Sequence, residues 1–105
     1  MPHASLCEQA EDDLAEIWAY IAIDNDRAAE KTVAKIRSAC QLLSEFPGVG
    51  PQRPEILRGL RSFPVGNYII FYRPATHGID VARIIHGKRN VKRILRSRKK
   101  GDTPT

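Results

Sequence analysis

Three strand-like runs divided by turn residues fill much of the second half of the chain and constrain its fold most strongly. The runs are residues 60–63, 68–73 and 81–89, and Gly66-Asn67 and Thr76-His77-Gly78 stand between them where hairpin turns belong. This spacing predicts an antiparallel meander. Strands normally fill with apolar and β-branched residues, so an arginine inside each run predicts a sheet whose second face meets a negatively charged partner.

Two amphipathic helices are predicted ahead of the strands. Apolar residues recur at the three-to-four spacing of one helix face, first on their own and then again after Asn25, which is a good N-cap. These positions are Ala10, Leu14, Ile17, Trp18 and Ile21, followed by Ala29, Val33, Ile36, Cys40 and Leu43. Phe46-Pro47-Gly48 stops the second helix, so the two form an antiparallel hairpin. We expect Trp18 to be the large core residue that joins this hairpin to the sheet.

The remaining segments connect these elements. Residues 3–6 form either a short edge strand or the approach to a helix that begins at residue 6, because Ser5 and Glu8 have capping-box spacing. The turn-rich segment 48–54 is expected to be mobile or to lie over the surface. Asn90 is expected to cap a last short helix with apolar positions Val91, Ile94 and Leu95. The predicted fold class is α+β, with an N-terminal antiparallel helical hairpin packed on an antiparallel sheet of three to four strands and a short C-terminal helix.

Length and composition indicate one ordinary globular domain. We expect it to occupy residues 1–95 of the 105, followed by a basic, disordered tail in residues 96–105. No window has the length of a membrane span, and the acidic start lacks the basic and apolar parts of a secretory signal, so a cytoplasmic location is expected. Cys7 and Cys40 stand without a CxxC or Cys/His cluster, which predicts two reduced thiols and no metal site.

Charge changes sign along the chain. Residues 1–50 hold nine acids and four Lys/Arg, whereas residues 51–105 hold three acids and thirteen Lys/Arg. The segment 81–100 alone contains nine Lys/Arg and no acid. Such a run is either a solvated face or a surface for a polyanion, and the run itself does not choose between them.

Several short motifs, taken in order, resemble the toxins of the RelE/ParE superfamily, on the ParE side. The motifs are Ala10-x-x-Asp13-Leu14-x-x-Ile17-Trp18-x-Tyr20-Ile21, Ala28-Ala29, Phe46-Pro47-x-x-Gly50, Gly59-Leu60-Arg61, Tyr68-x-Ile70-Phe71-Tyr72 and Arg83-Ile84-Ile85-His86-Gly87-x-Arg89. The resemblance covers residues 7–95, and its specificity lies in the joint order and spacing. The chain departs from the pattern at Cys7, where a serine is usual.

The resemblance implies a small cytoplasmic toxin that is neutralised by a cognate antitoxin and needs no cofactor. One branch of the superfamily cleaves ribosome-bound messenger RNA, and the ParE branch inhibits DNA gyrase. Cleavage by a 2'-hydroxyl needs a base, an acid and cations for the phosphorane charge. The corresponding positions here hold Arg61, Ser62, Ile69, Arg89 and Leu95. Because only fragments of that machinery are present, with His86 as the one plausible base, we predict a non-enzymatic gyrase inhibitor.

The predicted contact surface is basic and lies near the C-terminus. We expect the residues that engage gyrase, with or without its bound DNA, to be Arg83, His86, Lys88, Arg89, Lys92 and Arg93. The alternatives are a ribosome-dependent ribonuclease using His86, Arg61 and Arg89, and a basic nucleic-acid-binding module without toxicity. Arg61 and Arg83 have a structural alternative, in which they pair with Asp13, Glu45 or Glu55 and hold helices to sheet. The antitoxin is expected to be ParD-like and acidic, in a hetero-oligomer with the toxin, and no motif specifies the residues that bind it.

Overall fold

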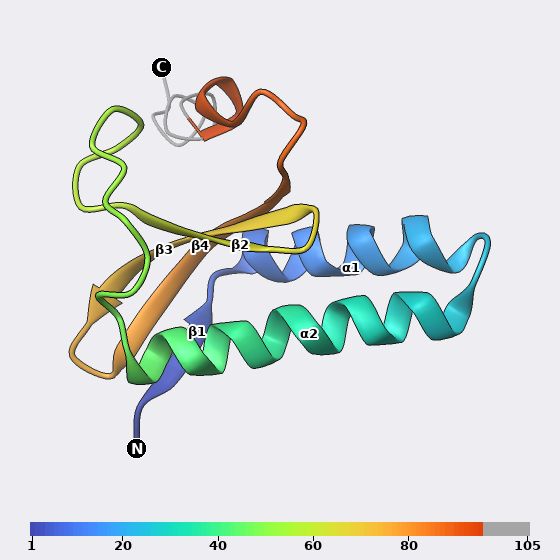
Figure 1. Cartoon of the computed structure of the whole chain (residues 1–105), viewed down its shortest axis with the longest axis horizontal. Helices are drawn as coiled ribbons and strands as arrows, with labels where there is room; N and C mark the ends of the chain where they lie inside the picture. Colours follow the sequence, from blue (N-terminus) through green and yellow to red (C-terminus); the bar gives the residue numbers. More distant parts are fainter. Residues whose placement is uncertain (96–105) are drawn as a thin grey trace.

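The computed structural model describes residues 1–95 and places two helices on one face of a four-stranded sheet (Figure 1). In chain order the elements are β1 (His3–Leu6), α1 (Glu8–Ala22), α2 (Asp26–Glu45), β2 (Arg61–Val65), β3 (Tyr68–Ala75) and β4 (Gly78–His86). A last helical turn covers residues 91–95. The predicted α+β class, the helical hairpin and the meander of β2, β3 and β4 are confirmed. Within the described part of the chain, no helix is both long and apolar enough to cross a membrane.

The first strand resolves the alternative left open at the N-terminus. Residues 3–6 form β1, which pairs in parallel with β4, so the sheet is mixed and its strand order is β1-β4-β3-β2. Gly78 makes this close pairing possible, because it adopts φ +137° and a Cβ there would collide with the backbone of His3. Helix α1 therefore begins at Glu8 and not at residue 6. Cys7 occupies its N-cap position without capping, and the thiol instead donates to the Ala82 carbonyl at 3.2 Å.

The helix hairpin follows from local signals. The Asn25 side chain accepts a hydrogen bond from the Ala28 N–H at 3.0 Å, as an N-cap should, and α2 ends at Glu45, just before Phe46 and Pro47. The apolar stripes of both helices pack on the sheet around Ala10, Leu14, Ile17, Ile36, Cys40, Leu43, Val65, Ile70, Tyr72, Ile79, Val81 and Ile84. The prediction for Trp18 was wrong. Its side chain is 40% exposed, because Ile17 takes the core position beside it at 8% exposure.

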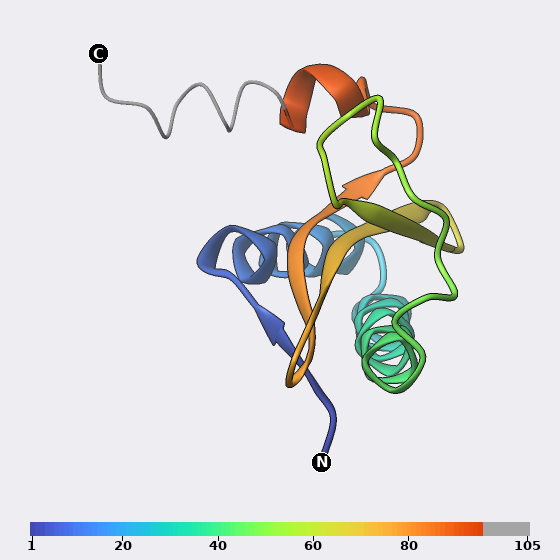
Figure 2. The same ribbon diagram turned by 90° about the vertical axis from the view of Figure 1, so that its left-hand side faces the viewer.

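The second face of the sheet is also covered, by chain segments that follow the helices (Figure 2). A second apolar cluster there consists of Ile56, Leu60, Phe71, Ile85 and Leu95. It joins the segment 53–60, the strands β3 and β4, and the helical turn 91–95. The prediction that the second face of the sheet meets a negatively charged partner was therefore wrong, because an apolar layer covers that face. Cations on this side of the molecule lie on the covering segments and at the strand ends, outside an apolar layer.

The segment after α2 lies over the surface and is fixed against the sheet, which is the second of the two expected alternatives. The Tyr72 hydroxyl donates to the Pro47 carbonyl at 2.8 Å and accepts from the Gly50 N–H at 2.9 Å. Arg61 donates to the Gly48 and Gly50 carbonyls at 3.3 and 2.6 Å. These bonds lay the segment along β2, the last strand of the sheet, and so protect an edge that could otherwise pair with another chain.

Candidate functional site

The predicted contact residues divide between the core and the surface, and Arg83 lies in the core. Its guanidinium donates from Nε and Nη2 to the two carboxylate oxygens of Asp13 at 2.8 and 2.9 Å, and the two side chains are only 10% and 8% exposed. These hydrogen bonds to Asp13 raise the pKa of Arg83 above its usual range. The structural alternative, a pair that holds helix to sheet, is therefore confirmed for Arg83. We leave Arg83 out of the surface that a target can touch.

Asp13 also satisfies a strand edge. β1 pairs with β4 only over Gly78–Val81, so beyond that point the outer side of β4 has no neighbouring strand among residues 1–95. The Ile84 N–H points to this side and donates to Asp13 at 2.9 Å. One carboxylate from α1 thus pairs with both a buried charge and a backbone donor, which would otherwise be buried without partners.

His86 ends β4 and is half-buried beside Tyr68. The two rings meet edge to face, with centroids 5.3 Å apart. The Nδ1 atom of His86 accepts a hydrogen bond from the Lys88 N–H at 3.1 Å, which leaves the hydrogen of the neutral ring on Nε2. Burial raises the pKa of Tyr68, and the nearby Tyr20 adds to the shift. The Tyr68 hydroxyl therefore stays a neutral donor at the site and is not poised as a base.

The four other predicted cations are exposed and lie on neighbouring segments. Lys88 and Arg89 occupy the turn after β4, while Lys92 and Arg93 lie on the helical turn 91–95. The Asn90 side chain accepts from the Arg93 N–H at 3.0 Å, which confirms the predicted cap. The helical turn buries Leu95 and faces Lys92 and Arg93 outward. The basic tail, residues 96–105, lies outside the described residues.

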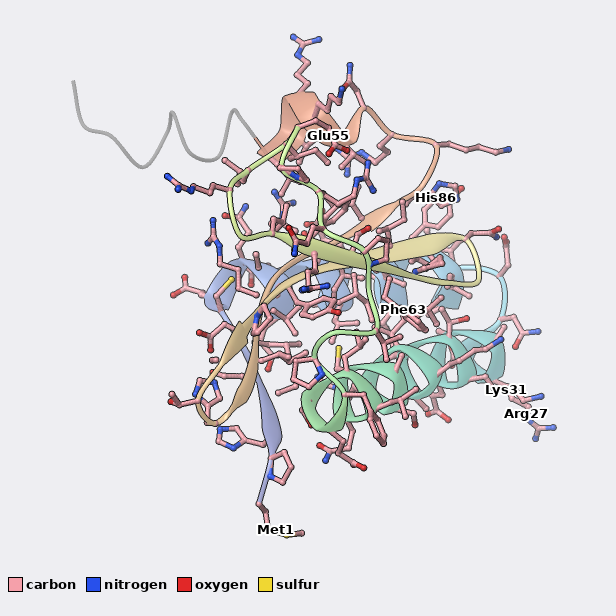
Figure 3. All side chains as sticks on the ribbon, turned by 60° about the vertical axis from the view of Figure 1, so that its left-hand side comes forward. Met1, Arg27, Lys31, Glu55, Phe63 and His86 are labelled. Atoms are coloured by element: carbon pink, nitrogen blue, oxygen red, sulfur yellow. The ribbon has the colours of Figure 1, made fainter. Side chains whose placement is uncertain are left out.

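Two further cations, which the sequence analysis missed, join this side of the molecule. Arg73 at the end of β3 donates to the carbonyl of Arg58 in the segment 53–60, at 3.4 Å. Both side chains are exposed. The segment that carries Arg58 runs beside the helical turn 91–95, where Glu55 lies (Figure 3), and Lys92 contributes to lowering the pKa of Glu55, after the larger effect of its hydrogen bond with Arg53. For Arg73 the regular spacing of arginines on the predicted strands was a signal, but it does not specify the face of the sheet. For Arg58, which precedes β2, the sequence offered no such signal.

The residues of the ribonuclease alternative do not come together. Arg61 pairs with Tyr72 on β3, whereas His86 pairs with Tyr68. Four residues along one strand span roughly 13 Å at about 3.3 Å per residue, and the two side chains also start from strands on opposite sides of β3. Arg61 is in addition held by the carbonyls of the Gly48–Gly50 segment. Arg89 is near His86, so two of the three residues come together, but Arg61 cannot act with them on one bond.

An open cavity of about 390 Å³ lies between α1 and the end of β4. Its lining combines acids, aromatic rings and a cation, from Asp13, Glu16, Ile17, Tyr20, Tyr68, Ile84, Ile85, His86 and Arg89. Tyr20 at its rim is 75% exposed, and Ile23, one turn further, is 79% exposed. Exposed apolar side chains beside a cavity are typical of a protein-binding surface. Residues 1–95 contain no group of three or more His, Cys, Asp or Glu side chains able to hold a metal ion.

Comparison with known sequences gives one consistent match. The profile of the family described as "ParE toxin of type II toxin-antitoxin system, parDE" matches residues 5–91. Toxin ParE1 of Caulobacter vibrioides is 24% identical over 94 residues, covering 86% of this chain and 94% of the relative. Putative toxin Y4kP of Sinorhizobium fredii is 32% identical over 84 residues, covering 78% and 84%. These matches span most of both chains, so they concern the whole domain.

Solved structures with a similar fold agree with this assignment. The chromosomal ParDE system of P. aeruginosa contains a chain that superposes with a TM-score of 0.68 at 22% identity, covering 82% of this chain and 96% of that one. A chain of the toxin-antitoxin complex RelBE2 from Mycobacterium tuberculosis superposes with a TM-score of 0.59 at 26% identity, covering 82% and 99%. The hairpin on a mixed sheet is therefore shared by chains of both systems.

Proposed function

Because the chain belongs to the ParE toxin family of type II toxin–antitoxin systems, we propose that it inhibits DNA gyrase by binding, without catalysing a reaction, and that a cognate antitoxin neutralises it. Its site of action is then the cytoplasm, where gyrase and DNA are. The observation that carries the proposal is the separation of Arg61 from His86 on the sheet, together with exposed cations around the end of β4. Groups arranged in this way can bind a target, but they do not converge on a scissile bond.

The target-binding residues in this proposal are His86, Lys88, Arg89, Lys92 and Arg93. Four of them are exposed, and His86 is half-buried at the base of the group. Electrostatic attraction to a target of opposite charge speeds association and orients the two partners. Arg83 contributes indirectly, because its pair with Asp13 fixes the strand from which His86 and the following turn extend.

The antitoxin would dock on the exposed apolar side chains of the helical hairpin. Trp18, Tyr20 and Ile23 are 40%, 75% and 79% exposed, and Tyr20 lies beside the cavity at the end of β4. Aromatic and aliphatic anchors of this kind supply most of the binding energy in protein interfaces. The antitoxin is expected to be acidic overall, which matches the C-terminal half of the toxin, where residues 51–105 hold thirteen Lys/Arg and three acids. A solved neighbour in the form of a toxin-antitoxin complex supports such a partner.

Gyrase assays with the purified chain test the proposal. We expect inhibition of DNA supercoiling and accumulation of broken, gyrase-bound DNA as toxin is added. Lys88→Gln combined with Arg89→Gln should weaken inhibition. His86→Gln should weaken it by a smaller factor, because it removes one half-buried contact and no proton-transfer group. The antitoxin encoded beside the toxin should abolish the effect in the same tube.

Three results would contradict the proposal. One is normal supercoiling with no trapped breaks at a large excess of toxin. Another is codon-phased cleavage of messenger RNA during induced expression, lost in His86→Gln, which would establish the ribonuclease alternative. The last is unchanged growth during induction, which would leave a nucleic-acid-binding module without toxicity.

A further inference from the structure

We propose that the side of the molecule opposite the helices binds the phosphate backbone of duplex DNA directly. This inference deepens the proposed function, because it names the DNA held by gyrase as a ligand of the toxin itself. The surface, called here the cationic face, consists of Arg58, Arg73, Lys88, Arg89, Lys92 and Arg93, and all six side chains are exposed. Arg89 lies at its border, because it also lines the cavity beside α1. Four of these cations, Lys88, Arg89, Lys92 and Arg93, were predicted from the sequence. The other two, Arg58 and Arg73, are brought beside them by the fold.

Cations outnumber acids in the half of the chain that forms this face. Residues 51–95 contain nine Lys/Arg and two acids. Glu55 is already bound by Arg53 at 2.7 Å, and Asp80 is bound by His77 at 2.8 Å. Lys92 interacts electrostatically with Glu55, and Asp80 lies opposite Arg73 in the strand register, so the two acids offset only part of the charge of the six cations. Closely placed cations in excess of acids raise the free energy of the isolated toxin, and a polyanion relieves that repulsion.

Exposed apolar side chains lie on the other half of the chain. The large hydrophobic residues with high exposure are Met1, Trp18, Tyr20, Ile23, Leu42, Phe46 and Val49. All belong to residues 1–50, and none in the described range 51–95 is comparably exposed. Protein interfaces depend on aromatic and aliphatic anchors, whereas phosphate backbones are bound mainly by Lys, Arg and polar groups. The two halves of the chain therefore suit different partners, a protein on the hairpin and a polyanion on the cationic face.

The aromatic residues of the sheet favour duplex over single-stranded nucleic acid. Proteins that hold single strands stack bases on exposed aromatic rings. Phe71 and Tyr72 are fully buried, and Phe63 and Tyr68 are half-buried. Phe71 in addition belongs to the apolar layer beneath the segment 53–60 and the helical turn 91–95. A surface with cations and no available stacking ring can hold a duplex by its phosphates, without reading the sequence.

The strength of the interaction should depend steeply on salt. For six phosphate contacts the logarithmic slope of affinity against salt concentration is about −5, so affinity falls on the order of a thousandfold between about 50 and 200 mM salt. Each cation removed should make the slope shallower by about 1. The slope therefore reports the number of phosphate contacts. A slope of about −5 indicates a surface of several cations, and a slope of about −1 or −2 indicates only one or two chance contacts.

Fluorescence anisotropy with a short labelled DNA duplex, in the absence of gyrase, tests the inference. The full chain is compared with Lys92→Gln combined with Arg93→Gln, and with a control in which Arg27→Gln and Lys31→Gln remove two exposed cations from α2, away from the cationic face (Figure 3). All three proteins carry the same residues 96–105, so their differences report only on the substituted positions. Unchanged thermal unfolding shows that each variant is folded, as expected for exposed positions.

We expect the first pair of substitutions to reduce affinity about tenfold or more at low salt and to reduce the slope by about 2, while the control matches the unsubstituted chain. Absence of salt-dependent binding, or equal losses in both variants, would overturn the cationic face. Tighter binding to an RNA duplex or to single-stranded DNA would overturn the choice of duplex DNA. The supercoiling assay is independent of this measurement: inhibition of gyrase without DNA affinity would reject the inference and leave the proposed function standing.

Discussion

Replacing Asp13 with alanine tests whether its buried pair with Arg83 fastens α1 to β4. The carboxylate accepts hydrogen bonds from Arg83 Nε and Nη2 at 2.8 and 2.9 Å and from the Ile84 N–H at 2.9 Å. Alanine would leave a guanidinium charge and a backbone donor in a site where the Arg83 side chain is 10% exposed. Removing one partner of a buried pair costs about 3–5 kcal/mol. We therefore expect Asp13→Ala to lower the free energy of unfolding by about 4 kcal/mol.

Urea and thermal unfolding of purified variants measure this loss. A domain of this size loses about 4–8 °C of melting temperature per kcal/mol, so Asp13→Ala should melt at least about 16 °C below the unsubstituted chain. Glu11→Ala is the matched control. Glu11 lies on the same helix and pairs with Arg37 at 3.1 Å, but both side chains are about half exposed, at 50% and 54%. An exposed pair of this kind contributes about 0–1 kcal/mol.

A double variant separates the pair from the positions that carry it. Asp13→Leu together with Arg83→Met replaces both charges with apolar side chains, which is often neutral or stabilising at buried pairs. It should be markedly more stable than either single substitution, because no unpaired charge remains. The reasoning fails if Asp13→Ala costs no more than Glu11→Ala, or if the losses of the two single substitutions simply add in the double variant.

Three further predictions concern single positions. Burial raises the pKa of the Cys40 thiol from 9.0 to about 11, so its contribution to stability is fully present below pH 9 and is lost as the pH rises toward 11, by up to about 3 kcal/mol. Urea titrations of Cys40→Ala should show a smaller fall in the free energy of unfolding between pH 9 and about 11 than the unsubstituted chain shows, and an equal fall would contradict this. Tyr72→Phe leaves the Gly50 N–H and the Pro47 carbonyl without their partner and should cost about 1–3 kcal/mol, with faster amide exchange at Gly50 by NMR; unchanged exchange would show that the hydroxyl does not hold the segment. Trp18→Ala should lower the free energy of unfolding in urea by less than about 2 kcal/mol, because the side chain is only partly buried. A loss of about 3–5 kcal/mol, which is typical of a buried tryptophan, would show that Trp18 is a core residue after all.

Local patterns specified the elements, and the errors arose where two local solutions were equally good. Asn25 and Pro47 fixed the ends of α2, because capping and the missing proline N–H act within a few residues. Ile17 and Trp18 are neighbours about 100° apart on a helix, so both cannot face the core fully, and spacing alone does not choose. Ile17 faces the core because α1 packs against both β4 and α2, and these two contacts fix the rotation of α1 about its axis. The choice of strand for residues 3–6 likewise depends on a distant partner, β4.

The sequence shows where each cation stands in the chain, but not whether its side chain is free to bind a partner. That depends on which residues of other segments face it in the fold. The basic run that starts at residue 81 looks uniform, yet Arg83 is buried by a carboxylate 70 residues away while Arg89 is exposed. Arg58 and Arg73 lie outside that run and still reach the same side of the molecule, because the segment 53–60 folds over the second face of the sheet. A pattern of charge along the chain records how many cations exist. Which of them can bind a partner depends on the apolar layer that turns each side chain inward or outward. That layer joins the segment 53–60, the strands β3 and β4, and the helical turn 91–95.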